Sequence, residues 1–283
     1  MLGKVDFLYV FNYRAPYFQD AFERLLFSIK SIKNQDVTVC ISNNSPQCIQ
    51  KKVSEVIENF KYHHQVYNGL FNKALCINYA VKNLVETDYF IISDVDLVYS
   101  KDHIQRLKLK IDNLTTPSEK IRFITYNYNL HPRFEKPKLA RVAARIPFVR
   151  KYFQDENYYF PYSYSSDFTV LDQLPKSAGG FAHGNGLVHL ETFMALRGYD
   201  EEMIGYGPED GLFNTRISKV NRVIYDNLPD TASYHLWHPR FHMIQVEKNI
   251  KNWQEKTVFY NSLKNPTYEQ LRANLSCEDW GVM

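Results

Sequence analysis

The stretch YFIISDVDLVYS (residues 89–100) runs from apolar residues that favour burial directly into two carboxylates, Asp94 and Asp96. Successive side chains of an extended strand alternate between its two sides, so these carboxylates are expected on the same side. Two like charges held that close repel each other unless a cation lies between them. The stretch therefore predicts a metal ion at the end of a core strand, or else a loop so hydrated that the repulsion is harmless.

The composition limits the class of protein. With 283 residues and 45% hydrophobic content, the chain can bury a full core, as one large domain or two small ones. A net charge of +3 is too small to indicate a nucleic-acid partner. The 4 cysteines show no CxxC spacing, which argues against a zinc cluster and favours reduced thiols in the cytoplasm. The N-terminal apolar run is too short for a signal peptide, and no stretch reaches the roughly 20 apolar residues of a membrane span.

The first hundred residues alternate between short apolar runs and segments with helical spacing. We expect strands at 5–12, 36–44, 65–67 and 89–93, and helices at 17–34, 46–60 and 74–85. This alternation predicts an α/β fold, a mostly parallel sheet with helices on both faces. Ligands of such sheets bind beyond the carboxyl ends of the strands. Polar side chains follow three strand ends and are expected to line one crevice: Asn12 and Arg14, Asn43 and Asn44, and the pair Asp94 and Asp96.

The patterns after residue 100 are weaker. Residues 121–128 predict a strand, and residues 242–264 have helical spacing. The Tyr- and Ser-rich residues 155–172 predict a loop over the site. The basic segment 133–151 favours a solvated helix face, although it would also suit an anionic membrane surface or an anionic acceptor.

A second dense region covers residues 178–219. Its glycines permit close approach of the backbone to a ligand, or turns that other residues cannot make. A predicted helix over 190–196 ends at Gly198, and the sequence GPED at 207–210 begins another that runs to about Lys219. Taken alone, a proline followed by acidic residues is an ordinary helix start.

Three motifs occur in order along the chain. They are DVD at 94–96; a run from GNG at 184–186 through RGYDEE at 197–202 to GPED at 207–210, with Arg216 beyond it; and SYHLWHPR at 233–240. Together they resemble the GT-A glycosyltransferases, in particular inverting enzymes of the family 2 and family 7 type. Those families include β-1,4-galactosyltransferases and bacterial chondroitin-type polymerases.

A fourth segment and two departures qualify the resemblance. The segment NKAL at 72–75 with Asn78 resembles the family's stretch beside the nucleotide, and it equally fits the ordinary start of an amphipathic helix. Pro208 precedes the Glu-Asp pair where the family often has glycine. Tyr206 stands where a tryptophan typically stacks on the acceptor sugar. These departures leave the catalytic carboxylate in place and concern the acceptor.

The resemblance implies one compact, Rossmann-like GT-A domain over residues 1–241, with a nucleotide-binding half at 1–100 and an acceptor-binding half at 101–241. Residues 242–283 would form a helical tail packed on this body. The implied reaction is metal-dependent, inverting transfer of a sugar such as Gal, GalNAc or GlcNAc from a UDP-sugar to a hydroxyl group of a glycan or a lipid-linked oligosaccharide. We expect such an enzyme in bacterial surface polysaccharide synthesis, in the cytoplasm or at the inner face of the cell membrane through segment 133–151.

The metal ligands follow from the motif positions. The resemblance implies Mn²⁺ or Mg²⁺ bound directly by Asp96, with Asp94 beside it and either His235 or His238 completing the protein ligands. Oxygen ligands with one imidazole suit these ions far better than a thiolate site would.

The resemblance also implies roles for the remaining site residues. Asp210 would take the proton from the acceptor hydroxyl, and Glu209 would hydrogen-bond a sugar hydroxyl. The dipole at a helix N-terminus lowers the pKa of such a carboxylate unless burial reverses the effect. The expected contacts of the donor nucleotide and its sugar are Asn12, Arg14, Asn43, Lys73, Asn78, Asp94, Gly180 and Tyr206.

Other functions stay open at this point. A sugar nucleotidyltransferase also combines an α/β sheet with metal-binding aspartates, but it would need a glycine-rich basic loop that VFNYRAPYF (10–18) lacks. A binding protein of the same fold without activity would not need its motif carboxylates and His235 intact. Retaining transfer also stays open, since the stereochemistry here rests on the Glu-Asp pair alone.

Overall fold

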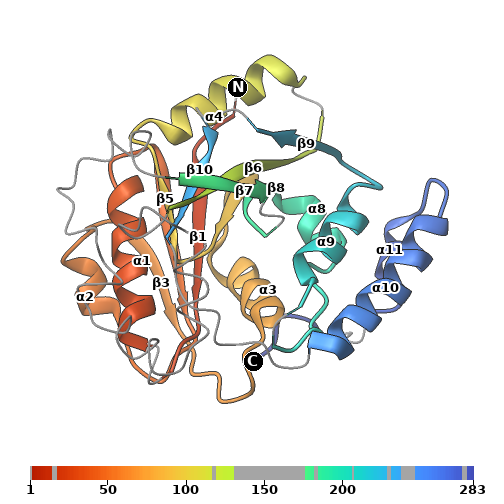
Figure 1. The fold of residues 1–283 in the computed structure, drawn as a ribbon, viewed down its shortest axis with the longest axis horizontal. Helices are drawn as coiled ribbons and strands as arrows, with labels where there is room; N and C mark the ends of the chain where they lie inside the picture. Colours follow the sequence, from red (N-terminus) through yellow and green to blue (C-terminus); the bar gives the residue numbers. More distant parts are fainter. Residues whose placement is uncertain are drawn as a thin grey trace.

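The computed structural model describes residues 2–14, 18–116, 119–130, 176–181, 184–205, 207–227, 231–236, 246–275 and 279–283. In this part of the chain ten strands form one sheet, with helices on both of its faces (Figure 1). The strands are β1 (Val5–Phe11), β2 (Val37–Asn43), β3 (Phe60–His64), β4 (Tyr89–Ser93), β5 (Leu97–Tyr99), β6 (Ile121–Leu130), β7 (Lys176–Phe181), β8 (Gly186–His189), β9 (Arg222–Asp226) and β10 (Ser233–Leu236). The helices are α1 (Phe18–Ile32), α2 (Gln50–Ser54), α3 (Lys73–Leu84), α4 (His103–Leu114), α8 (Leu190–Ala195), α9 (Glu209–Ile217), α10 (Val246–Ser262) and α11 (Tyr268–Arg272).

The sheet has a parallel half and a mixed half. Strands β3, β2, β1 and β4 are parallel neighbours in that order, as the strand–helix alternation predicts. Beyond β4, the antiparallel strand β8 joins it to β6, and β10 lies between β6 and β5. The carboxyl ends of β1, β2 and β4 therefore lie at one edge of the sheet, and one continuous sheet connects both halves of the chain.

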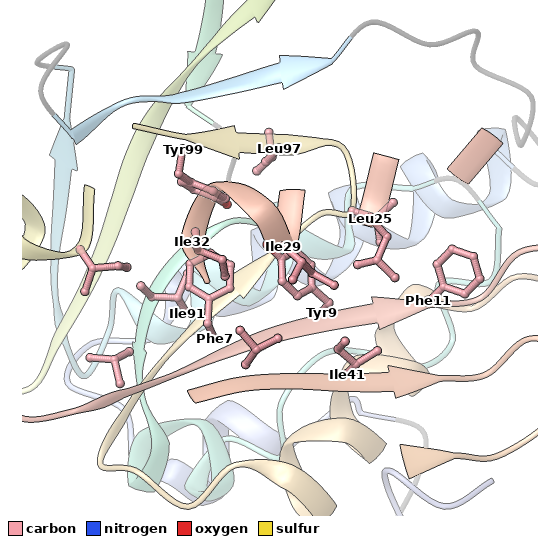
Figure 2. Close-up of a cluster of buried hydrophobic side chains, with 14 of the residues drawn as sticks. Phe7, Tyr9, Phe11, Leu25, Ile29, Ile32, Ile41, Ile91, Leu97 and Tyr99 are labelled. Atoms are coloured by element: carbon pink, nitrogen blue, oxygen red, sulfur yellow. The ribbon is translucent and has the colours of Figure 1, made fainter. Parts of the chain in front are cut away.

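The alternating side chains of β1 supply two separate cores. Phe7, Tyr9 and Phe11 point toward α1 and pack with its buried residues (Figure 2). Leu8 points to the opposite face and packs in the cluster that contains Ile77 of α3. Burying side chains of this size stabilises the fold by about 1.5–3 kcal/mol each. Packing on both faces therefore holds β1, and with it the strand end that leads to the site, in place.

Two boundaries in the first half differ from prediction. The predicted helix over 46–60 is limited to the short helix α2, and Phe60 already begins β3. The predicted strand at 65–67 is wrong, because β3 occupies residues 60–64 and pairs with β2 from Val39 onward. Pairing with a neighbouring strand outweighs the local helical pattern here.

The second half confirms several predicted elements and adds others. The strand predicted at 121–128 is β6 and extends to Leu130, and the helices predicted at 190–196 and after Pro208 are α8 and α9. The helix predicted in the C-terminal part is α10, and α11 follows it. Strands β5, β7, β8 and β9 were not predicted. The basic segment 133–151 and the predicted loop 155–172 lie outside the described residues.

Candidate active site

The two carboxylates of DVD lie in a turn between β4 and β5 rather than in an extended strand. The expectation of an extended strand at these two residues is therefore wrong, and strand alternation does not set their directions. Asp94 contacts Lys73 and Asn185, whereas Asp96 contacts His235. The side chain of Asp94 is 37% exposed and that of Asp96 only 8%, so the two carboxylates occupy different environments.

Asp96 and His235 form the part of the site suited to a metal ion. The backbone N–H of Leu236 donates to the carbonyl of Asp96 at 2.8 Å, which fixes β10 against the turn. As a result, Nε2 of His235 lies 3.7 Å from Oδ2 of Asp96. Two coordinate bonds of about 2.1 Å each can span this separation, and a carboxylate with an imidazole suits Mn²⁺ or Mg²⁺.

The predicted metal ligands do not all converge. Among the described residues, no group of three or more His, Cys, Asp or Glu side chains is close enough to hold a metal ion. Asp94 is directed to Lys73 and Asn185, and His238 lies outside the described residues. The protein part of the site therefore offers the pair Asp96 and His235, which leaves coordination positions for a ligand such as a diphosphate.

Asn185 holds Asp94 by two hydrogen bonds. The backbone N–H of Asp94 donates to Oδ1 of Asn185 at 2.8 Å, and Nδ2 of Asn185 donates to Oδ2 of Asp94 at 3.2 Å. Asn185 is buried, and Gly186 follows it with a φ of 116°, where a Cβ would lie 2.2 Å from the carbonyl oxygen of Phe123. Glycine is therefore required at 186 to bring Asn185 against the turn.

Lys73 connects Asp94 to Asp210. It is the first residue of α3, and the side chain of Asn72 caps this helix by accepting from the N–H of Leu75 at 3.0 Å. The Nζ atom of Lys73 lies 3.0 Å from Oδ1 of Asp94 and 3.2 Å from Oδ2 of Asp210. Burial by itself would lower the pKa of Lys73, but Asp210, Asp94 and Glu209 raise it well above its usual value.

Glu209 and Asp210 begin α9 and face this same region. A Cβ at Gly184 would lie 2.4 Å from Oδ2 of Asp210, so only glycine leaves room for this carboxylate. Oε2 of Glu209 and Oδ1 of Asp210 are buried, and neither has a hydrogen-bond partner in the described part of the chain. Burial, followed by repulsion from Asp210, raises the pKa of Glu209 to about 8, although Lys73 acts in the opposite direction. Burial thus raises the pKa of Glu209 by more than the dipole at the start of α9 lowers it.

Two of the predicted donor contacts prove to be internal. Asn43 is fully buried: its amide donates to the carbonyl of Gln47 at 2.6 Å and to the hydroxyl of Tyr62 at 2.9 Å, and its oxygen accepts from the N–H of Ser45 at 3.1 Å. Asn78 is fully buried as well, and its amide donates to the carbonyl of Tyr199 at 2.9 Å. Because these amides are already engaged within the protein, neither side chain is placed to contact a nucleotide.

Of the other predicted donor contacts, Asn12 and Arg14 follow the carboxyl end of β1. Asn12 donates to Sγ of Cys76 at 3.6 Å, and Arg14 donates to the carbonyls of residues 67 and 69 at 2.5 and 3.2 Å. Gly180 is exposed on β7, where a Cβ would meet nothing within 4 Å. Tyr206 lies outside the described residues.

Arg122 is a site-supporting residue that sequence reasoning missed. It is fully buried in β6 and donates to the carbonyl of Asn185 at 3.3 Å, to the carbonyl of Leu187 at 3.1 Å and to Oδ1 of Asn214 in α9 at 3.2 Å. It therefore joins the turn that holds Asp94 to the helix that carries Asp210. An arginine inside a strand that otherwise predicts burial was the available signal, because buried charges need partners.

Comparisons with known proteins address the fold. The sequence matches no protein-family model and no curated protein. Among solved structures, TarS from S. aureus in complex with UDP-GlcNAc matches with a TM-score of 0.57 at 12% identity, over 97% of this chain and 71% of that chain. GalNAc-T7 with UDP, GalNAc and Mn²⁺ matches with a TM-score of 0.53 at 11% identity, over 96% of this chain and 54% of that chain. A mannosyltransferase from Pyrobaculum calidifontis with GDP-Man and Mn²⁺ matches with a TM-score of 0.50 at 12% identity, over 96% and 68% of the two chains.

This chain has the GT-A fold. The fold predicted from the motif order is thereby confirmed. In this GT-A fold the DVD turn follows β4 at the carboxyl edge of the parallel strands, and α9 brings Glu209 and Asp210 to the same edge. No helix in the described part of the GT-A fold is both long enough and apolar enough to cross a membrane.

Proposed function

We propose that this protein is a glycosyltransferase that moves a sugar from a nucleoside-diphosphate donor, most simply a UDP-sugar, to a hydroxyl group of a glycan acceptor. The observation that carries the proposal is the convergence of Asp94 with Asp210 on the one ammonium group of Lys73, at the carboxyl edge of a GT-A sheet. Two motifs that lie far apart in the sequence thus meet where ligands of α/β sheets bind.

The donor side is built from Asp96, His235, Asp94 and Lys73. Asp96 and His235 would hold Mn²⁺ or Mg²⁺, which when bound neutralises charge on a diphosphate leaving group. Asp94, which Asn185 holds in place, would contact the ribose or a water bound to the metal. Lys73 places a fixed positive charge beside the phosphates, where preorganised charge is most effective.

The acceptor side is built from Glu209 and Asp210. Asp210 would take the proton from the acceptor hydroxyl as that oxygen attacks the anomeric carbon, and its buried Oδ1 is available for this contact. Glu209, with a pKa raised to about 8 by burial and then by Asp210, holds a proton at neutral pH and can donate it in a hydrogen bond to a sugar oxygen. A single base with direct attack inverts the anomeric centre without a covalent intermediate.

The proposal extends to the biological setting of the reaction. Gal, GalNAc or GlcNAc from UDP is the donor group we expect, with a glycan or lipid-linked oligosaccharide of bacterial surface polysaccharide synthesis as acceptor. Two of the three structural neighbours named above hold UDP or a UDP-sugar, which supports uridine as the base to test first. Segment 133–151 would bring the protein to the inner face of the membrane through its basic side chains.

The first test is calorimetric titration of UDP into the protein with and without Mn²⁺. Wild type is compared with Asp96→Ala and with Asp36→Ala, a control at an exposed carboxylate paired with Lys108 away from the site. We expect metal-dependent binding in wild type and in the control, and none in Asp96→Ala. Absence of UDP binding under every condition would remove the donor assignment, and GDP would then be titrated.

The second test separates catalysis from binding. Asp210→Asn keeps the shape of the side chain and removes the base, so it should retain UDP binding and lose transfer from UDP-sugars to glycan acceptors. Unchanged transfer by this variant would exclude Asp210 as the base. Binding of UDP-sugars by wild type, with neither transfer nor donor hydrolysis across all donors, would favour a binding protein of the same fold.

A further inference from the structure

The loop of residues 199–205 joins α8 to α9 and is bound on one side to α3. The N–H of Gly205 donates to the carbonyl of Phe71 at 2.6 Å, and Nδ2 of Asn72 donates to the carbonyl of Glu201 at 2.8 Å. Because Asn72 also caps α3, its amide group connects the loop to the helix turn that carries Lys73. A few residues further along the chain α9 begins with Glu209 and Asp210.

Lys256 of α10 binds this loop from the other side. Its Nζ lies 2.6 Å from Oδ2 of Asp200 and 2.7 Å from Oε2 of Glu202. Lys256 is 9% exposed and Asp200 is 2% exposed. The desolvation of a buried ion pair largely offsets its Coulomb energy, so such a pair contributes little to stability. A role in fixing the geometry of the loop explains the buried pair of Lys256 and Asp200 better than a contribution to stability does.

Other residues of α10 and of the C-terminal end also contact the loop 199–205. Nδ2 of Asn249 donates to the carbonyl of Ile204 at 2.8 Å, and a Cβ at Gly207 would lie 2.9 Å from Asn249. The N–H of Gly281 donates to Oε1 of Glu201 at 2.6 Å. In Figure 1, α10 runs beside α9 on the outer side of the molecule, and the C-terminus lies next to α3. The C-terminal residues therefore hold the loop along its length.

We infer that Lys256 is a positioning residue: it holds the loop 199–205 so that Lys73 on α3 and Asp210 on α9 keep their mutual distance. The expected loss of turnover rests on the proposed function. The expected loosening of the start of α3 rests only on the hydrogen bonds through Asn72. This role of Lys256 makes α10 a part of the catalytic unit instead of a tail packed on a finished domain.

The experiment compares Lys256→Met with Lys251→Met, a control in the same helix whose side chain is 79% exposed. Hydrogen exchange is measured in the ligand-free protein for peptides covering 199–205 and 70–78. We expect faster exchange in both peptides for Lys256→Met and no change for Lys251→Met. Faster exchange in the loop alone, with 70–78 unchanged, would overturn the inference.

The catalytic consequence is measured as kcat and KM on the same proteins. We expect kcat of Lys256→Met to fall by about 10- to 100-fold, the effect of displacing reacting groups by a fraction of an ångström to an ångström, with KM changing far less. A lowered melting temperature with kcat unchanged would show a merely structural role and overturn the inference.

A second variant guards against loss of folding. Lys256→Met combined with Asp200→Asn removes both charges, so no buried carboxylate is left without its cation. We expect its melting temperature to recover toward wild type while kcat stays low and exchange at 70–78 stays fast. Recovery of kcat as well would show that Lys256 only balances charge. If wild type transfers no sugar, the proposed function fails, while the exchange pattern still decides whether Lys256 positions α3.

Discussion

The ammonium group of Lys73 lies 3.2 Å from the carboxylate of Asp210, so the first residue of α3 contacts the first turn of α9. The two helices belong to different halves of the sequence, and this contact joins them at the edge of the sheet. Since Lys73 also lies 3.0 Å from Asp94, its position sets how far Asp94 lies from Asp210, and so the distance between the proposed donor and acceptor sides.

In the proposed reaction, replacing Lys73 with methionine should lower turnover by about 100-fold or more, because it removes a preorganised charge beside the leaving nucleoside diphosphate. It also leaves Asp94 and Asp210 close together with no cation between them. Sugar transfer measured at saturating donor and metal tests the expectation. Lys51→Met, at an exposed position in α2, is the control and should behave as wild type. Turnover within threefold of wild type in Lys73→Met would show that this charge is not used.

Asn185→Asp should weaken UDP binding by roughly 10- to 100-fold, the equivalent of one lost charge-assisted hydrogen bond of about 1.5–3 kcal/mol. The substitution keeps the shape of the side chain, but its new carboxylate oxygen replaces the amide that donates to Asp94. Repulsion then turns Asp94 away from its present position. Calorimetric titration of UDP with Mn²⁺ measures the change, and Asn83→Asp on the exposed end of α3 is the control. Equal affinity in Asn185→Asp and wild type would contradict the role of Asn185 in holding Asp94.

The sequence was most informative where chemistry and periodicity agree. Alternating strands and helices predict the parallel order of β1, β2 and β4 and the convergence of their carboxyl ends, both of which the structure contains. The order of the DVD, GPED and SYHL motifs pointed to the GT-A fold. Motifs of this kind can be recognised because each places specific side chains next to a turn or a helix start.

The predictions that proved wrong concern features that depend on contacts between segments far apart in the sequence. Strand β8 has only four residues and gains its place from pairing with β4 and β6, which local sequence does not encode. Asn43 was expected at the site because it ends a strand and Asn78 because it belongs to the segment that begins with NKAL, yet their amides bind neighbouring backbone and side-chain groups. The geometry of Asp94 and Asp96 could not follow from strand alternation, since the chain turns between them.

The free energy of unfolding should fall as the pH rises through the range in which Glu209 loses its proton. Burial, and then the charge of Asp210, raise the pKa of Glu209 from its ordinary 4.5 to about 8. Between these values the folded protein keeps a proton that the unfolded chain has released. The stabilising contribution of this group is therefore complete below pH 4.5 and is lost as the pH rises through about 8.

Glu209→Gln mimics the protonated form and should remove this part of the pH dependence. Urea unfolding of the ligand-free protein at about pH 5 and about pH 8 should show a smaller difference for Glu209→Gln than for wild type. Glu255→Gln, at a side chain that is 67% exposed, should keep the wild-type difference. An identical pH dependence in Glu209→Gln and wild type would mean that Glu209 titrates normally.

Arg216, which lies beyond the GPED motif in α9, should prove to be a residue of stability rather than of catalysis. It is fully buried, and its guanidinium donates to the carbonyls of Leu271 at 2.9 Å and Gly198 at 2.7 Å, and to that of Leu196. Gly198 lies just past the end of α8 and has a φ of 56°, so Arg216 connects α9 to the chain that follows α8 and to α11.

Arg216→Met leaves three buried carbonyls without their donor and should lower the free energy of unfolding by about 3 kcal/mol or more, since each such group costs about 1–3 kcal/mol. Arg216→Lys keeps one charge but cannot reach three diverging acceptors, so an intermediate loss is expected. Urea unfolding followed by circular dichroism measures both, with Arg222→Met at a half-exposed side chain as control. UDP affinity of the folded fraction should be unchanged in Arg216→Lys. A loss of UDP binding without a loss of stability would instead place Arg216 in the binding site, a placement that its burial behind α8 and its carbonyl partners argues against.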